Sequence, residues 1–317
     1  MTAPADTDSK VVPPRLAILG PTASGKSAVA LELVSLLAAR GRDVELVSID
    51  AMQVYRGMDI GTAKPTIEER RRVPHHLIDL VDPGHDYSLA EFRDSATRVI
   101  EEIEGRGGTA VLVGGTGLYV RAIVDRLEIP GVWPGIRRRL EEEAERLGTE
   151  VLHARLRESD PVAAAKMEPS NTRRVVRALE VVEGSGRPFS SFGPGLDTYP
   201  ETPVIQVALR WSRDALARRI EERVDRMFEA GLVDEVRSLV SRGLSRTAAQ
   251  ALGYKEIIGH LEGRTSLVEA RNEIVLRTRQ FAVRQERWFR RDPRVRWFDV
   301  GSDPVSEVAP RLLPLLP

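Results

Sequence analysis

The chain has 317 residues, of which 42% are hydrophobic and 30% charged, a composition typical of soluble globular proteins. At about 150 residues per domain, this length predicts roughly two domains. The absence of cysteine excludes disulfide scaffolds, zinc–thiolate sites and thiol nucleophiles. The formal net charge is zero, from 47 basic and 47 acidic residues, and by itself it neither indicates nor excludes an acidic partner.

The start of the chain and its hydropathy bear on where the protein acts. Residues 1–14 are polar and contain no apolar core, so we expect a disordered tail and not a signal peptide. No apolar stretch approaches the roughly 18 residues that a membrane helix needs. We therefore expect a cytoplasmic protein without a membrane partner, and no feature of the sequence indicates an obligate protein partner.

The first part of the chain alternates short apolar runs with amphipathic segments. Buried strands are predicted at 15–20, 44–49 and 109–113, where each apolar run ends in glycine or aspartate. Helices are predicted at 28–40 and 88–104, the second with a serine and a glutamate that form a capping box. Strands that alternate with helices predict a doubly wound parallel α/β sheet.

From about residue 130 the sequence becomes helical and strongly charged. Two predicted helices and a Gly/Pro/Ser-rich connector occupy 137–157, 171–183 and 184–203. A core strand then resumes at 204–209. We therefore expect residues 130–200 to form a helical insertion domain in an α/β core that consists of 15–129 and 201–317.

The C-terminal part of the core is predicted to be helical from 212 to 290, with a late edge strand at 295–300. Residues 271–296 include nine arginines and three acidic residues, a net charge of +6. Such a segment suits a phosphodiester backbone, but an exposed helix with local ion pairs fits the pattern equally well. Gln280 and Arg284 could instead line a channel around a diphosphate.

A phosphate-binding motif follows the first predicted strand. The run Gly-Pro-Thr-Ala-Ser-Gly-Lys-Ser matches G-x-x-x-x-G-K-[ST], with a strand before it and a helix after it. In this motif backbone N–H groups and the helix N-terminus bind one anion, Lys26 bridges the terminal phosphate oxygens, and the Ser27 hydroxyl binds Mg²⁺. The sequence thus predicts a P-loop NTPase-like parallel sheet core with a helical insertion domain. The predicted phosphate-binding residues are Gly20, Pro21, Thr22, Ala23, Ser24, Gly25, Lys26 and Ser27.

Asp50 directly follows the second predicted strand. A motor-type NTPase needs an apolar strand that ends in a metal-binding aspartate, but the third strand ends in Gly114-Gly115-Thr116 and offers no carboxylate. In small P-loop kinases an acid at the place of Asp50 faces the acceptor. The pattern therefore favours group transfer to an acceptor over a motor-type ATPase, with the capping of a turn as the alternative role of Asp50.

A longer block resembles a known family. Residues 47–65, VSIDAMQVYRGMDIGTAKP, closely resemble the tRNA dimethylallyltransferases, also called tRNA isopentenyltransferases. Further similar segments follow in order, namely GGTGLY at 114–119, RALEV at 177–181, ALGYK at 251–255, TRQ at 278–280 and RQ at 284–285. The resemblance extends from about residue 15 to 299 and therefore covers nearly the whole chain.

The resemblance implies a prenyl transfer. The donor is dimethylallyl diphosphate, held with Mg²⁺ by the phosphate loop, and the acceptor is the exocyclic amine of adenosine 37, just 3′ of a tRNA anticodon. Asp50 is implied as the general base and Arg223 as a diphosphate ligand, with Thr116 beside them at the catalytic centre. The partner is the tRNA anticodon stem-loop, for which the insertion 130–200 is predicted to provide a grip. The implied tRNA-binding residues are Asp50, Ala51, Met52, Gln53, Thr116, Arg137, Arg173, Arg174, Gln250, Gly253, Tyr254 and Lys255.

The chemistry of the reaction fits these residue types. An adenine amine is a weak nucleophile, because its lone pair is delocalised into the ring, so it needs placement and a proton acceptor such as Asp50. The leaving diphosphate gains charge, which Lys26, Arg223, backbone N–H groups and Mg²⁺ can stabilise. A stacked anticodon-loop base cannot reach such a pocket, so we expect the nucleotide to be flipped out.

Other functions remain open at this stage. A P-loop nucleoside or shikimate kinase would lack both the insertion and the arginine-rich C-terminal part. An adenylate isopentenyltransferase prenylates free AMP and needs no large RNA-binding insertion. A pure RNA-binding module would leave the phosphate loop and Asp50 unexplained.

Some polar residues also have two interpretations. Arg137 stands beside Arg138 and Arg139, so a solvated helix face competes with an RNA contact. His75 and His76 lie near two aspartates in the sequence, but no third metal ligand is evident. We expect surface or packing roles for these histidines.

Overall fold

The computed structural model describes residues 15–193 and 195–316, and within them the chain divides into two compact units. The sheet unit consists of the described residues up to Tyr87, of Ser95–Val120 and of those from Glu201 onward. The helical unit consists of Ser88–Asp94 and Arg121–Pro200. It extends further toward the N-terminus than the predicted insertion 130–200. The predicted tail 1–14 lies outside the described residues.

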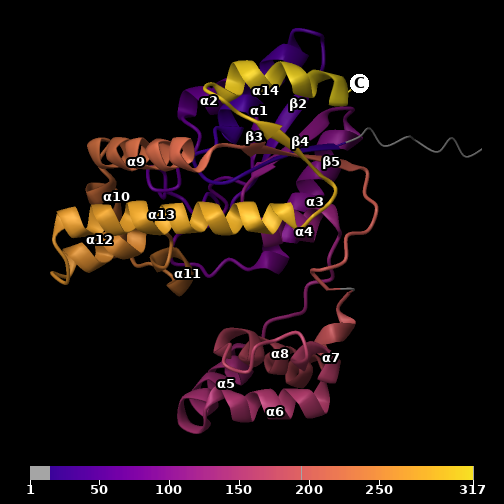
Figure 1. Ribbon diagram of the computed structural model, residues 1–317, viewed down its shortest axis with the longest axis vertical. Coiled ribbons are helices and arrows are strands. Elements are labelled where there is room, and N and C mark those ends of the chain that lie inside the picture. The colour runs from indigo at the N-terminus through magenta and orange to yellow at the C-terminus, as the bar shows by residue number, and fades with distance from the viewer. Residues whose placement is uncertain (1–14, 194, 317) are drawn as a thin grey trace, which may run out of the picture. The chain divides into compact units, whose positions relative to one another are not determined.

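The sheet unit is built on six parallel strands in the order β3-β2-β4-β1-β5-β6 (Figure 1). The strands are β1 Arg15–Leu19, β2 Val44–Ile49, β3 His75–His76, β4 Thr109–Gly114, β5 Val204–Arg210 and β6 Val295–Asp299. Every residue of β2 and β4 is buried, as expected for strands covered on both faces. The predicted α/β fold class and its late edge strand are confirmed.

The register of the sheet brings three strand ends together. Gly114, the last residue of β4, pairs with both Leu19 of β1 and Ile49 of β2. The loops that follow β1, β2 and β4 therefore leave the sheet side by side, at the edge where open α/β sheets bind ligands. These loops contain the phosphate loop, Asp50 and Thr116.

Ten helices and a short 3₁₀ segment belong wholly or partly to the sheet unit within the described residues. They are α1 Lys26–Ala38, α2 Ile67–Arg72, α3 Leu89–Gly105, α4 Gly117–Val124, α9 Arg213–Glu229, α10 Leu232–Arg242, α11 Arg246–Ala249, α12 Tyr254–Leu261, α13 Leu267–Arg290, α14 Pro304–Leu312 and η2 Leu313–Leu315. Helices α1 and α14 pack together, and α13 lies along α9 and α12 (Figure 1). Leu33 of α1 and Leu312 of α14 share one apolar cluster with Leu16 and Val111 of the sheet. No helix in the described ranges is long and apolar enough to cross a membrane.

The helical unit corrects one prediction. It contains α5 Pro134–Leu147, α6 Thr149–Ser159, α7 Pro161–Ala164, α8 Thr172–Ser185 and the 3₁₀ segment η1 Phe189–Ser191. The single helix predicted at 137–157 is wrong, because Gly148 adopts φ 86° and ψ 149° and separates α5 from α6. Breaking the helix there lets Leu140 and Leu156 meet Val175 of α8 in one buried core.

Candidate active site

The phosphate loop joins β1 to α1 through three residues with positive φ, namely Gly20, Ala23 and Gly25. No side chain caps the N-terminus of α1, so the first N–H groups of the helix stay available to an anion. Glycine is required at position 25 for two reasons. Its φ is 89°, and a Cβ there would overlap Pro304. The loop therefore has the local form that its motif predicts.

Neighbouring side chains bind two carbonyl oxygens of the phosphate loop. Trp211 donates through Nε1 to the Ser24 carbonyl at 2.9 Å, and Arg219 donates through Nε to the Ala23 carbonyl at 2.9 Å. The same Arg219 guanidinium stacks on the Trp211 ring at 4.4 Å. These contacts engage two carbonyl oxygens of the loop and fix its backbone from the side of β5 and α9.

Gln285 of α13 joins the phosphate loop to the end of β4. Its Oε1 accepts from the Thr22 N–H at 2.8 Å, and its Nε2 donates to the Gly115 carbonyl at 2.8 Å. Gln285 was not predicted as a site residue, although it lies in one of the family-like segments. A contact between residues 263 positions apart leaves no local pattern in the sequence.

Two cations and one carboxylate surround the phosphate loop. Arg223 of α9 donates to the Thr22 hydroxyl at 2.9 Å. Burial lowers the pKa of Lys26 to about 8, the Arg223 guanidinium adds to that shift, and Asp50 opposes it. Burial also lowers the pKa of Arg223, again against the effect of Asp50. The centre thus has an excess of positive charge that a bound anion would relieve.

Asp50 and Thr116 meet at the ends of β2 and β4. The Asp50 Oδ1 accepts from the Met52 N–H at 2.9 Å, so this oxygen caps a turn. The Oδ2 accepts no hydrogen bond from the residues that the structure describes. The Thr116 hydroxyl accepts from the Ala51 N–H at 3.4 Å and so lies beside Asp50. The structure therefore brings together Asp50, Thr116, Arg223 and the phosphate loop.

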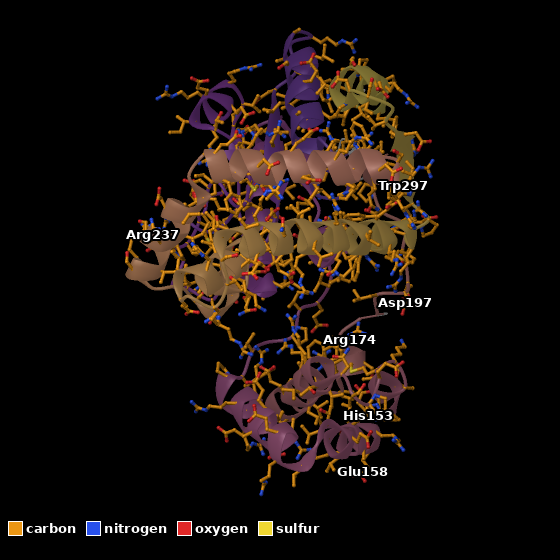
Figure 2. All side chains as sticks on the ribbon, turned by 60° about the vertical axis from the view of Figure 1, so that its left-hand side comes forward. His153, Glu158, Arg174, Asp197, Arg237 and Trp297 are labelled. Atoms are coloured by element: carbon orange, nitrogen blue, oxygen red, sulfur yellow. The ribbon has the colours of Figure 1, made fainter. Side chains whose placement is uncertain are left out.

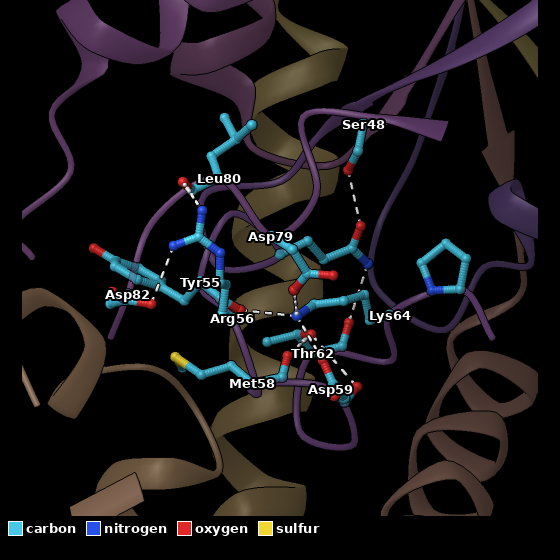
Figure 3. A network of polar contacts seen from close by, with 12 residues as sticks. Ser48, Tyr55, Arg56, Met58, Asp59, Thr62, Lys64, Asp79, Leu80 and Asp82 are labelled. Atoms are coloured by element: carbon cyan, nitrogen blue, oxygen red, sulfur yellow. Dashed lines mark hydrogen bonds and ion pairs between the residues drawn. The ribbon is translucent and has the colours of Figure 1, made fainter. Parts of the chain in front are cut away.

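The loop 50–65 that follows Asp50 is held by its own polar groups (Figure 3). The Ser48 hydroxyl donates to the Gln53 Oε1 at 2.8 Å, and Gln53 Nε2 donates to the Thr62 carbonyl at 3.3 Å. The Lys64 ammonium, buried apart from 1% of its side chain, binds Asp59 and Asp79 at 2.6 Å each. The Gln53 side chain, predicted to contact tRNA, is thus engaged within this loop.

The segment 250–255 precedes and begins α12. Gln250 and Lys255 are exposed, and Gly253 has a φ of 93° just before the helix. Tyr254 is fully buried, and its hydroxyl donates to Glu235 at 2.6 Å. The Tyr254 side chain is therefore not open to a macromolecule, which limits the predicted tRNA contact at this residue to its backbone.

Three further predicted residues lie in the helical unit. Arg137 binds the fully buried Glu180 carboxylate at 2.7 and 2.9 Å, so it is fixed there rather than free in solvent. Arg173 and Arg174 are exposed in the first turn of α8 (Figure 2, where Arg174 is labelled). Neither of these two arginines forms an ion pair with another described residue. Both are thus available to phosphate groups, whereas Arg137 is already paired.

Most of the arginine-rich segment 271–296 lies in α13, which ends at Arg290. Its guanidinium groups are mostly paired, as in the ion pairs Arg271–Asp225, Arg277–Glu273, Arg279–Glu221, Arg290–Glu286 and Arg294–Asp292. Arg284 and Arg287 are exposed and form no ion pair within the described ranges. Three of these pairs use acids already counted in the +6, so only Asp225 and Glu221 of α9 offset it, by two of the six excess charges.

Fold and site together define a P-loop-like α/β protein with an acid and two cations at the phosphate loop. The family model described as IPP transferase matches residues 53–292, and the chain belongs to this family. It is 52% identical to the tRNA dimethylallyltransferase of Kineococcus radiotolerans, with 96% of each chain covered. It is 51% identical to that of Streptomyces coelicolor, covering 94% of this chain and 93% of the relative. The family predicted from the sequence is confirmed.

Solved structures agree with this membership. The full-length tRNA isopentenylpyrophosphate transferase of Bacillus halodurans has a TM-score of 0.68 and 41% identity, with 95% of this chain and 96% of that chain covered. A eukaryotic dimethylallyltransferase, described as acting on tRNA, has a TM-score of 0.77 and 26% identity, with 94% and 77% covered. The fold is thus shared over nearly the whole length of this chain.

Proposed function

We propose that this protein transfers the dimethylallyl group of dimethylallyl diphosphate to the exocyclic amine of adenosine 37 of tRNA. The products are N6-dimethylallyladenosine and diphosphate. The observation that carries the proposal is the position of Asp50 beside a phosphate loop with two desolvated cations, Lys26 and Arg223. Relatives that share about half of their residues with this chain are named tRNA dimethylallyltransferase, which supports the same activity.

The donor diphosphate occupies the phosphate loop in this proposal. Backbone N–H groups at the start of α1, Lys26 and Arg223 are preorganised donors for the charge that develops on the leaving diphosphate. Arg223 already lies at the loop, because it donates to the Thr22 hydroxyl. An allylic carbon–oxygen bond breaks, and the released diphosphate stays bound to these cations.

Mg²⁺ fits this site as a ligand shared by protein and donor. The Ser27 side chain is exposed in the first turn of α1 and offers one oxygen. No group of three or more His, Asp or Glu side chains among the described residues could hold a metal ion. Mg²⁺ usually binds through few protein ligands, substrate phosphates and water. When bound beside Ser27, the ion would supply charge neutralisation to the diphosphate.

The acceptor amine lies against Asp50. One carboxylate oxygen is fixed by the Met52 N–H, which leaves the other to accept the amine proton. The amine nitrogen forms a bond to the allylic carbon while its proton passes to Asp50 and then to solvent. Thr116, which accepts from the Ala51 N–H, holds the turn next to this carboxylate.

The tRNA reaches this site with its adenosine flipped out of the anticodon loop. Arg173 and Arg174 of the helical unit are exposed and form no ion pair within the described residues. They can therefore bind the phosphates of the stem-loop. Because the acceptor is a tRNA, we propose that the protein acts in the cytoplasm.

One labelling experiment tests this function against the alternatives. The protein is incubated with Mg²⁺ and radiolabelled dimethylallyl diphosphate together with tRNA, AMP or ATP in separate reactions. Label is expected in tRNA, and digestion should place it on N6 of one adenosine. Label in AMP alone would indicate an adenylate isopentenyltransferase, and absence of label from all three acceptors would contradict prenyl transfer.

A further inference from the structure

The Glu235 carboxylate of α10 accepts four hydrogen bonds. Three come from consecutive backbone N–H groups, those of Asp59 at 2.9 Å, Ile60 at 2.8 Å and Gly61 at 3.2 Å. The fourth comes from the Tyr254 hydroxyl at 2.6 Å. A single side chain thus joins the loop 50–65 to the segment 250–255. Both of these segments contain residues predicted to contact tRNA.

The loop side of this contact is stiff. The Asp59 carboxylate binds the buried Lys64 ammonium at 2.6 Å, and Lys64 also donates to the Tyr55 carbonyl at 2.8 Å (Figure 3). Gln53 then connects the end of the loop to Ser48 of β2, two residues before Asp50. Hydrogen bonds thus connect the part of the loop around residues 59–62 to the strand that leads to Asp50.

The other side of the contact is equally constrained. A Cβ at Gly61 would overlap the Tyr254 ring, so the loop backbone lies directly on this ring. Burial and the Glu235 carboxylate raise the pKa of Tyr254 above its usual range, which keeps the hydroxyl protonated as a donor. The first turn of α12, with the exposed Lys255, is thereby held at a fixed distance from residues 59–61.

We propose that Glu235 is a positioning residue for the tRNA acceptor, whose carboxylate sets the spacing between the loop 50–65 and the segment 250–255. This inference rests on the proposed function, because it assumes that both segments face the RNA. Glu235 touches neither substrate. It acts by keeping the Asp50 turn and the surface around Lys255 in one geometry.

The chemistry of the contact requires a carboxylate. Four donors need two oxygens with free lone pairs, which only ionised Asp or Glu provides. Glutamine at this position would offer one oxygen, and in either orientation its NH₂ group would face at least one backbone N–H donor. All four partners of Glu235 lie in the two tRNA-facing segments, and none in the phosphate loop. Loss of the carboxylate should therefore affect the acceptor and spare the donor.

The experiment compares Glu235→Gln with Asp234→Asn on the full-length protein. Asp234 is the neighbouring acid of α10, its side chain is 80% exposed, and its partner is Arg237, so its substitution is a matched control. We expect Glu235→Gln to lower kcat/KM for an anticodon stem-loop RNA by about 10- to 100-fold, the cost of misplacing a reacting group by roughly 1 Å. The Kd of dimethylallyl diphosphate should change by less than about twofold.

Two further variants separate positioning from general stability. Glu235→Asp retains the charge on a shorter side chain and should recover part of the lost kcat/KM. Tyr254→Phe removes one of the four donors and keeps the ring against Gly61, so its effect should be smaller than that of Glu235→Gln. Amide hydrogen exchange at residues 59–61 should accelerate in Glu235→Gln and not in Asp234→Asn.

The outcomes are distinguishable. Wild-type kcat/KM and unchanged exchange at 59–61 in Glu235→Gln would overturn the inference. A parallel loss of donor affinity and RNA turnover would do so too, because it would show a merely structural role. If the wild-type protein transfers no prenyl group to RNA, the proposed function fails, whereas the exchange data still report whether Glu235 holds the loop.

Discussion

The pH dependence of donor binding is a direct consequence of the desolvated Lys26. Its pKa is lowered from 10.5 to about 8 by burial and by Arg223, so the free protein loses the Lys26 charge as the pH rises through 8. If the protein binds the diphosphate only when Lys26 is protonated, Kd is proportional to one plus the ratio of neutral to charged Lys26. At pH 9 that factor is about 11, whereas an unperturbed lysine would change Kd by only a few per cent.

The assay is equilibrium binding of dimethylallyl diphosphate without RNA between pH 7 and pH 9.5. Over this range the ligand is almost fully ionised, since phosphate groups have a second pKa near 6. Relative to its value at low pH, the wild-type Kd should be nearly unchanged at pH 7, about double at pH 8 and about 11-fold higher at pH 9. The profile levels off at high pH, where the ligand itself raises the pKa of Lys26 in the complex.

Lys26→Arg is the matched control, because arginine stays charged throughout this range. Its Kd should be nearly independent of pH, even where its affinity is lower than that of the wild type. A flat wild-type profile would mean that Lys26 is not the desolvated cation that the structure indicates. An identical slope in Lys26→Arg would assign the titration to another group and refute the reasoning.

Three further predictions concern the other site residues. Asp50→Ala should lower turnover by about 10²- to 10⁴-fold in the RNA prenylation assay; a collapse of donor or Mg²⁺ affinity instead would make Asp50 a metal ligand. Arg223→Ala should raise the Kd of dimethylallyl diphosphate by about 10- to 100-fold through loss of a charged hydrogen bond, while a gel shift should show almost unchanged tRNA affinity. Replacing Arg173 and Arg174 together by Ala should weaken tRNA binding. It should also make the slope of log K against log salt concentration less steep, by about 0.7–0.9 for each of up to two lost phosphate contacts; an unchanged slope and affinity would mean that other residues bind the RNA.

The hydropathy pattern of short segments was sufficient to predict the strands that surround the phosphate loop. The strands that end at Leu19, Ile49 and Gly114 are continuous apolar runs, which is how strands buried on both faces look in a sequence. Once the sheet is parallel, the loops after these strands share one edge. The position of Asp50 near the phosphate loop was predicted from the order of elements, whereas the place of Thr116 was implied only by the family resemblance.

The same kind of pattern gave a wrong prediction where a single residue determines whether a helix continues or ends. A glycine inside a helix costs only about 1 kcal/mol, so the periodicity across Gly148 predicted one long helix. The structure uses its positive φ to turn the chain between α5 and α6. The family resemblance implied Tyr254 as a tRNA-binding residue, but its side chain is fully buried.

The residues that the sequence could not reveal are those that join distant segments. Gln285 connects the phosphate loop to Gly115, and Glu235 connects residues 59–61 to Tyr254. Each uses both ends of a planar side chain to satisfy backbone groups of loops that have no ladder partners of their own. Such loops supply the reacting groups, but their geometry depends on helices far along the chain. Substitution of Glu235 in α10 or of Gln285 in α13 should therefore alter catalysis, although neither side chain touches a substrate.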